Sequence, residues 1–145
     1  MEKNSLPRNK IFVDTLFVIA LINERDQYHE RAAELANLFD GQPLLITDAV
    51  LLEIGNALAR HFRTEAAQVI DTFLSSEDVE IVHISPDLLN RALRLFKAHH
   101  DKEWGLVDCI SFVVMREAGV SAALTFDRHF IQAGFQALFH DGQDG

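Results

Sequence analysis

Four acidic side chains interrupt stretches of the sequence that are otherwise apolar. They are Asp14 in "FVDT", Glu53 in "LLEIGNAL", Asp108 in "GLVDCISF" and Asp127 in "LTFDRHF". An isolated carboxylate in apolar surroundings is costly to bury unless it has a partner. Because breaks in an expected hydrophobic pattern tend to fall at functional sites, these four acids are the first candidates for such a site.

Carboxylates gathered in one cleft repel one another, by up to about 4 kcal/mol per pair at 4 Å for an effective dielectric constant of 20. A divalent cation removes this repulsion. The ligands are all hard oxygens, which favours Mg²⁺ or Mn²⁺ over Zn²⁺, and the seven histidines form no H-E-x-x-H spacing. One or two such ions can activate water for attack on a phosphodiester. The pattern therefore predicts metal-assisted phosphodiester hydrolysis.

Each acid taken alone also has a purely structural explanation. A carboxylate at the start of a helix caps backbone N–H groups or interacts favourably with the helix dipole, and Asp108 is a fair example. The combination of four acids at the ends of separate elements is what favours a shared site.

The elements that carry these acids are predicted to alternate between strands and helices. Apolar runs predict strands at 10–13, 44–47, 79–84, 121–126 and 135–139. Periodic patterns predict helices at 15–23, 26–39, 49–62, 64–76, 86–100 and 106–118, and a short turn before the last strand. This alternation favours the α/β class, as a three-layer α/β/α sandwich with a mostly parallel central sheet.

The predicted sheet explains how distant acids can meet. Ligands of open parallel sheets bind at the carboxyl ends of the strands. Asp14 and Asp127 directly follow predicted strands, whereas Glu53 and Asp108 fall within the first turn or two of helices. If those helices begin beside strand ends, all four side chains point into one cleft. We therefore expect Asp14 on the rim of the core.

Composition indicates one soluble domain over residues 1–145, with a polar N-terminal arm at 1–9 and a polar tail at 140–145. No apolar run reaches the roughly 18 residues of a membrane span, and no signal peptide is visible. The single Cys109 fits a reducing cytoplasm. A net charge of −9 argues against a broad basic surface for nucleic acid. It leaves nucleic acid open as a substrate, because bound cations can neutralise carboxylates locally.

These segments resemble the PIN-domain family of metal-dependent ribonucleases, which includes the toxins of VapBC-type toxin–antitoxin modules. The resemblance runs from Ile11 to about Phe139, and its most specific part is "DKEWGLVDCISFVVMREAGVSAALTFDRHFIQAGF". It implies that the four acids bind Mg²⁺ or Mn²⁺. Thr15 and Thr125 match positions that orient carboxylates or water, and Asn56 lies one turn beyond Glu53.

The resemblance also implies an activity and partners. The chain is expected to be an Mg²⁺- or Mn²⁺-dependent endoribonuclease that acts on RNA as the toxin of a type II pair. A cognate antitoxin and a homodimer are the expected protein partners, with helices over 32–39 and 64–74 as candidate surfaces. One departure is Gly105, where relatives often carry Ser or Thr to cap the helix of Asp108. Glycine costs only a few tenths of a kcal/mol there.

Basic side chains near the acids are candidates for contacts with RNA phosphates. Arg128 and His129, directly after Asp127, are the best placed, and Lys102 lies in the loop before Asp108. Further cations in these neighbourhoods are Arg60, His61, Arg63, Lys97, His99 and His100. Three other residues are expected to be structural or solvated: Trp104 as the anchor of its loop, Cys109 as a small buried hydrophobe, and Asp101 as a solvated acid.

Alternative functions differ in the residues they require. An aspartyl phosphatase would need D-x-D-x-[TV], and "DTLFV" lacks the second Asp. A receiver domain would need a lysine after a late strand, where "TFDRHF" has an aspartate. Both are disfavoured. Two alternatives stay open. One is a catalytically weak PIN fold that only binds protein or RNA, although the intact acids argue against it. The other is a different metal-dependent phosphohydrolase. The target, whether tRNA, rRNA or mRNA, also stays open.

Overall fold

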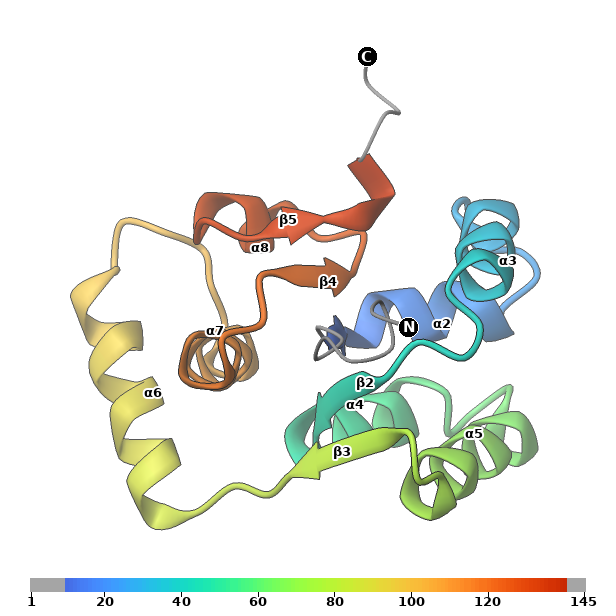
Figure 1. Ribbon diagram of the computed structural model, residues 1–145, viewed down its shortest axis with the longest axis horizontal. Coiled ribbons are helices and arrows are strands. Elements are labelled where there is room, and N and C mark those ends of the chain that lie inside the picture. Colours follow the sequence, from blue (N-terminus) through green and yellow to red (C-terminus); the bar gives the residue numbers. More distant parts are fainter. Residues whose placement is uncertain (1–9, 141–145) are drawn as a thin grey trace, which may run out of the picture.

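The structure is a computed structural model that describes residues 10–140. The arm predicted at 1–9 and the tail residues 141–145 lie outside this range. Strands and helices alternate along the chain (Figure 1). The strands are β1 (Ile11–Val13), β2 (Leu44–Thr47), β3 (Val79–Val82), β4 (Ala122–Leu124) and β5 (Gln136–Ala137). The helices are α2 (Thr15–Ile22), α3 (His29–Leu38), α4 (Asp48–Ala57), α5 (Arg63–Ser75), α6 (Pro86–Ala98), α7 (Leu106–Ala118), α8 (Arg128–Gln132) and a 3₁₀ turn η1 (Leu138–His140).

The described strands form one sheet in the order β3-β2-β1-β4-β5, and every neighbouring pair is parallel. Phe12 of β1 pairs with Leu45 of β2 on one side and with Ala123 of β4 on the other. Helices α6 and α7 cover one face, whereas α2, α3 and α5 lie on the other (Figure 1). The predicted three-layer α/β/α architecture is confirmed.

The core explains why the strand sequences read as continuous apolar runs. Strands covered on both faces have no solvated side, and Phe12 and Leu45 are fully buried. Beneath β1, the rings of Phe112 and Phe130 meet edge to face with centroids 5.0 Å apart. Phe12 lies 6.0 Å from Phe130. Aromatic packing thus fixes α7 and α8 against the central strands.

Side-chain caps fix where several helices begin and end. The Thr47 hydroxyl accepts a hydrogen bond from the Val50 N–H at 3.1 Å, so α4 starts directly at the end of β2. Ser85 caps α6 in the same way, through the Leu88 N–H at 3.0 Å. Helix α7 ends at Gly119, whose φ of 70° favours glycine. These predicted boundaries are confirmed.

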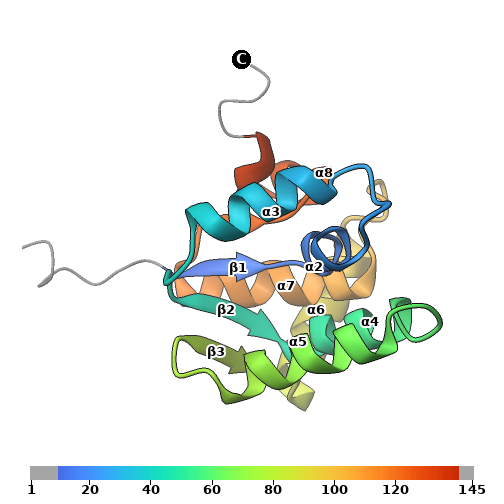
Figure 2. The ribbon, with the colours of Figure 1, turned by 90° about the vertical axis from the view of Figure 1, so that its right-hand side faces the viewer.

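Other boundaries differ from the prediction for local reasons. Helix α3 begins at His29 rather than at residue 26, because the Asp26 carboxylate accepts the Tyr28 N–H at 2.9 Å and forms a turn. Helix α4 ends at Ala57, so residues 58–62 are a turn instead of helix. These shorter helices leave loops after α2 and after α4, on the same side of the molecule (Figure 2).

The predicted turn after Asp127 is wrong, because Arg128–Gln132 form helix α8. The Asp127 carboxylate accepts the His129 N–H at 2.9 Å and starts this helix. The last strand is also shorter than expected and covers only Gln136–Ala137 before η1. No helix within residues 10–140 is long and apolar enough to cross a membrane.

Candidate functional site

A cavity of about 630 Å³ lies at the carboxyl end of the sheet, where β1 points toward α2 (Figure 2). All four predicted acids line it, together with Thr15 and Asn56. The acids come from four separate places in the fold: the end of β1, helix α4, the first turn of α7 and the segment after β4. The structure therefore brings together residues that are up to 113 positions apart, from 14 to 127.

Asp14 occupies the most enclosed position in this cavity, with only 5% of its surface exposed. The Thr125 hydroxyl donates a hydrogen bond to Asp14 Oδ2 at 2.7 Å and accepts one from the Asp127 N–H at 2.9 Å. Burial raises the pKa of Asp14 to about 7, and the nearby charges of Asp127 and Asp108 add to this rise. The Thr125 hydrogen bond opposes it. Thr125 thus links the two acids at the ends of β1 and β4.

Glu53 is held by the first residue of α2. The Thr15 hydroxyl donates a hydrogen bond to Glu53 Oε1 at 2.6 Å, which joins α2 to α4. Asn56 lies one turn further along α4, is exposed and lines the same cavity. Thr15 thus contacts Glu53 directly, and Asn56 shares the cavity with it.

Asp108 is the third residue of α7, and its carboxylate completes the helix start. Its Oδ2 accepts the Gly105 N–H at 3.0 Å, so half of a capping box forms although Gly105 has no hydroxyl. Burial raises the pKa of Asp108, and the charge of Asp127 acts in the same direction. The Gly105 N–H and His129 lower it. The Asp108 carboxylate therefore keeps its hydrogen bond to the helix start although residue 105 has no hydroxyl.

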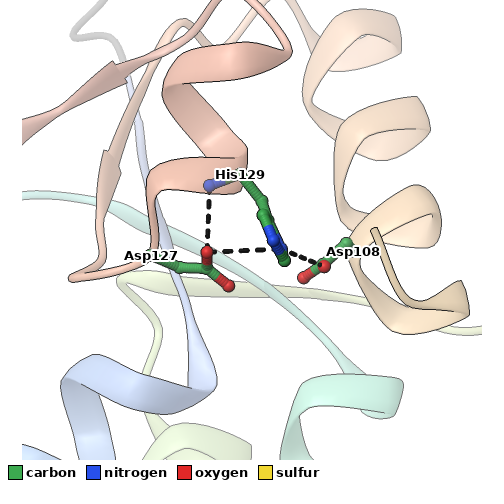
Figure 3. Close-up of side chains that lie close together, drawn as sticks. All are labelled: Asp108, Asp127 and His129. Carbon is green, nitrogen blue, oxygen red and sulfur yellow. Dashed lines mark hydrogen bonds and ion pairs between the residues drawn. The ribbon is translucent and has the colours of Figure 1, made fainter. Parts of the chain in front are cut away.

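His129 bridges two of the acids, as Figure 3 shows. Its Nδ1 lies 2.9 Å from Asp108 Oδ2 and 3.3 Å from Asp127 Oδ1, and its backbone N–H donates to Asp127 Oδ1. These three residues each offer one ligand atom, all within 4.8 Å of one another. The imidazole therefore lies among the carboxylates, on the first turn of α8.

The remaining predicted contacts lie outside this cluster. Arg128 is exposed on α8, and Lys102 is exposed with its Nζ 3.2 Å from Asp101 Oδ2. Neither residue is among those that line the cavity. Trp104 is buried, and its indole N–H donates to Gln132 Oε1 at 2.9 Å, so its predicted role as a loop anchor is confirmed. Cys109 is fully buried, and burial raises its pKa to about 11.

Three apolar residues that the sequence analysis does not name also line the cavity. They are Leu16, Ile19 and Ala57. Leu16 is 45% exposed. Helical spacing could have found two of them, because Ile19 and Ala57 each lie one turn beyond a polar residue of the site.

The donor set fits a hard divalent cation. Four carboxylates face one cavity, and repulsion among them contributes to the raised pKa of Asp14. A cation would favour the charged form of each acid and relieve that repulsion. The residues present are therefore suited to hold a metal through oxygen ligands, with His129 as a neighbouring nitrogen donor.

Comparisons with known proteins give matches over most of the chain. Residues 11–136 match the PIN domain family. Two sequences named 23S rRNA-specific endonuclease VapC20, from two strains of Mycobacterium tuberculosis, are 36% identical over 126 residues, which is 86% of this chain and 95% of each relative. The crystal structure of Mycobacterium tuberculosis VapC20, called a sarcin–ricin loop cleaving toxin, has a TM-score of 0.78 at 34% identity, covering 87% of this chain and 96% of that chain. The crystal structure of FitAcB from Neisseria gonorrhoeae has a TM-score of 0.59 at 16% identity, over 88% and 95% of the two chains, and shows a likeness of fold alone.

Proposed function

This chain belongs to the PIN-domain family, and from that premise we propose that it is a metal-dependent endoribonuclease, the toxin of a type II toxin–antitoxin pair. One observation supports the proposal above all others. Four carboxylates from four separate elements line a single cavity at the carboxyl end of a parallel sheet. Family membership also sets aside the aspartyl-phosphatase and receiver-domain alternatives.

We assign Asp14, Glu53, Asp108 and Asp127 as the residues that hold Mg²⁺ or Mn²⁺. A divalent cation bound there supplies charge that stabilises a phosphodiester under attack and makes water more acidic. The chain's own contribution is to position these carboxylates. Thr15 orients Glu53 through a 2.6 Å hydrogen bond, and Thr125 orients Asp14 through one of 2.7 Å.

The cations near the site are proposed to contact the RNA backbone. His129 directs Nδ1 to Asp108, which leaves Nε2 for a substrate phosphate or water. Arg128 and Lys102 are exposed on the segments next to Asp127 and Asp108, where they can hold flanking phosphates. Asn56 is proposed to hold water or a substrate hydroxyl, since its amide is exposed at the edge of the cavity.

Ribosomal RNA is the substrate class that we propose. The relative that supports it is named a 23S rRNA-specific endonuclease, and its similarity to this chain spans 86% of the residues. The sarcin–ricin loop named for the VapC20 structure is therefore the first target to test. Cleavage of tRNA or mRNA instead would contradict the proposed substrate class but not the proposed metal-dependent hydrolysis.

We further propose that this single PIN domain acts in the cytoplasm with an antitoxin and as a homodimer. Two exposed leucines support candidate protein surfaces on the predicted helices. Leu38 at the end of α3 is 70% exposed, and Leu74 near the end of α5 is 56% exposed. Size-exclusion chromatography with light scattering, alone and with the neighbouring gene product, would test both partners.

The decisive experiment compares RNA cleavage by three variants. The purified protein is incubated with ribosomes, tRNA and mRNA in Mn²⁺, Mg²⁺ or EDTA, and cut positions are mapped by primer extension. We expect metal-dependent cuts that EDTA abolishes. Asp14→Asn and Asp108→Asn should each reduce the rate by at least about 100-fold, because each removes a charged ligand.

Asp71→Asn is the matched control for these variants. It makes the same chemical change on an exposed acid of α5 that does not line the cavity. Its rate should stay within about twofold of the wild type. Full activity of Asp14→Asn and Asp108→Asn, or equal activity in EDTA, would rule out the proposed function.

A further inference from the structure

A second cavity, of about 500 Å³, opens between the loops that follow α2 and α4. It is lined by Asn23, Glu24, Arg25, His61 and Phe62. The first three residues come directly after α2, and the last two lie in the turn after α4. None of these residues belongs to the proposed metal site.

The two cavities follow the same pair of helices. Helices α2 and α4 pack side by side, and the hydrogen bond from Thr15 to Glu53 joins residues 38 positions apart. Ile19 and Ala57, which line the first cavity, are also 38 positions apart in the sequence. So are Asn23 and His61, which line the second cavity. The two helices therefore run in the same general direction along the chain. The second cavity begins about one helical turn, roughly 6 Å, beyond the first.

The second cavity differs from the first in its charge. Arg25 and His61 are both exposed, and within residues 10–140 neither side chain forms an ion pair. By contrast, Arg91 pairs with Asp87 and Glu117. Glu24 is the one acid that lines the second cavity. The seam between α2 and α4 thus runs from a group of carboxylates to a cavity lined by Arg25 and His61.

The turn around His61 adds further positive charge. Arg60 and Arg63 flank it, both are exposed, and neither has an ion-pair partner among the described residues. The whole chain carries a net charge of −9, whereas residues 60–63 include two arginines and a histidine and no acid. Phe62 lies between these cations, partly buried against the core, and lines the cavity.

We propose that the second cavity binds a backbone phosphate of the RNA strand, about one or two nucleotides from the bond that is cut. This inference rests on the proposed function. The Arg25 guanidinium is the main phosphate ligand, since it can donate two parallel hydrogen bonds to phosphate oxygens. His61 supplies a further donor, and the Phe62 ring offers an apolar surface to a ribose or base.

An RNA strand fits this arrangement better than an acidic peptide does. The acidic cavity repels the polyanion, and a metal offsets that repulsion only at the phosphate it contacts. Arg25, one turn away along the same seam, attracts the neighbouring phosphate together with Arg60 and Arg63, so the strand is held across the site. A protein ligand of the second cavity would not require that cavity to lie on the same seam as the four acids.

The first test measures RNA binding apart from cleavage. A fluorescein-labelled oligouridylate of about 12 nucleotides is titrated in EDTA, between about 50 and 200 mM salt. We compare wild type with Arg25→Gln, His61→Gln and Arg94→Gln. Arg94 is the matched control, because it is exposed on α6, which packs on α7, and it forms no ion pair within residues 10–140.

Loss of one phosphate contact should weaken binding by about 3- to 10-fold at low salt. It should also reduce the slope of log K against log salt by about 0.7. Arg25→Gln is expected to show both effects, His61→Gln a smaller effect, and Arg94→Gln neither. Wild-type affinity and slope in Arg25→Gln would overturn the inference, as would an equal loss in Arg94→Gln.

The second test locates the phosphate. Single methylphosphonate linkages are placed on either side of the cut in the RNA that the wild type cleaves. One linkage near the cut should raise KM for the wild type, and that penalty should vanish in Arg25→Gln, because the contact is already lost. A penalty that persists in Arg25→Gln overturns the subsite. Absence of any metal-dependent cleavage by the wild type instead overturns the proposed function.

Discussion

At the scale of residues, Asp14 combines burial with a raised pKa, within the proposed metal site. It lies at the end of the central strand, almost without solvent, and faces two further carboxylates. Its pKa of about 7 means that the native protein without metal holds a proton there which the unfolded chain releases near the ordinary value of 3.8. This behaviour is the reverse of that of a salt-bridged aspartate.

The raised pKa predicts how stability without metal depends on pH. In EDTA, the free energy of unfolding should fall as pH rises from about 4 to about 7, because the native state binds more protons than the unfolded state. The slope from Asp14 is at most about 1.4 kcal/mol per pH unit, and Asp108 acts in the same direction. Above about pH 7 the contribution of Asp14 levels off.

Urea denaturation in EDTA at several pH values measures this slope. Asp14→Asn should flatten it, because the amide does not titrate yet can still accept the Thr125 hydrogen bond. Asp71→Asn, an exposed change on α5, is the control and should leave the slope unchanged. A wild-type curve that rises over this range, or a variant as steep as the wild type, would contradict the raised pKa.

At the scale of elements, α7 is flanked by two glycines with opposite conformational requirements. Gly105 begins the helix with φ of −80°, which any residue adopts, whereas Gly119 ends it with φ of 70°. A Cβ atom at either position would meet nothing within 4 Å. The same substitution at the two ends therefore isolates the effect of backbone conformation from that of packing.

Serine at these two positions should change stability in opposite directions. Gly105→Ser should raise the free energy of unfolding by about 0.5 kcal/mol, because it adds a capping hydroxyl and restricts the unfolded chain. Gly119→Ser should lower it by about 1 kcal/mol, because serine is strained at that φ. Thermal unfolding checks both values. A loss at Gly105 would show that its N–H contact with Asp108 tolerates no side chain.

At the scale of the whole molecule, the proposed metal site joins segments that are distant in sequence. Its four carboxylates belong to the start of α2, to α4, to α7 and to the start of α8. A ligand that binds only the folded arrangement stabilises the entire fold by mass action. Metal binding should therefore be visible as a change in global unfolding.

Mn²⁺ at about 100 times its Kd should add about 2.7 kcal/mol and raise the Tm by about 5–10 °C. Asp108→Asn should reduce this shift to a small fraction, since it removes a charged ligand. Asp101→Asn should keep it, since this exposed acid lies outside the cavity. Differential scanning fluorimetry in Mn²⁺ and in EDTA provides the measurement. Equal shifts in the two variants would show that Mn²⁺ binds elsewhere.

Local patterns in the sequence predict most of the elements correctly. The apolar run before Asp14 predicts β1, and Thr47 and Ser85 mark helix starts that the structure confirms. Errors in the predicted boundaries arise where a side-chain carboxylate accepts a hydrogen bond from a nearby backbone N–H. The Asp127 cap that starts α8 and the Asp26 turn that delays α3 are examples, and both depend on short contacts that hydrophobic periodicity does not report.

The sequence by itself determined which residues can do chemistry, because a carboxylate in an apolar stretch is recognisable without coordinates. Its alternation of apolar and amphipathic segments likewise determined a parallel sheet that gathers strand ends at one edge. Only the tertiary structure decided that Asp14 is almost fully buried, that His129 lies against Asp108, and that Arg25 and His61 line a second cavity beyond the ends of α2 and α4. These features depend on how distant elements pack, and each local pattern is compatible with many packings.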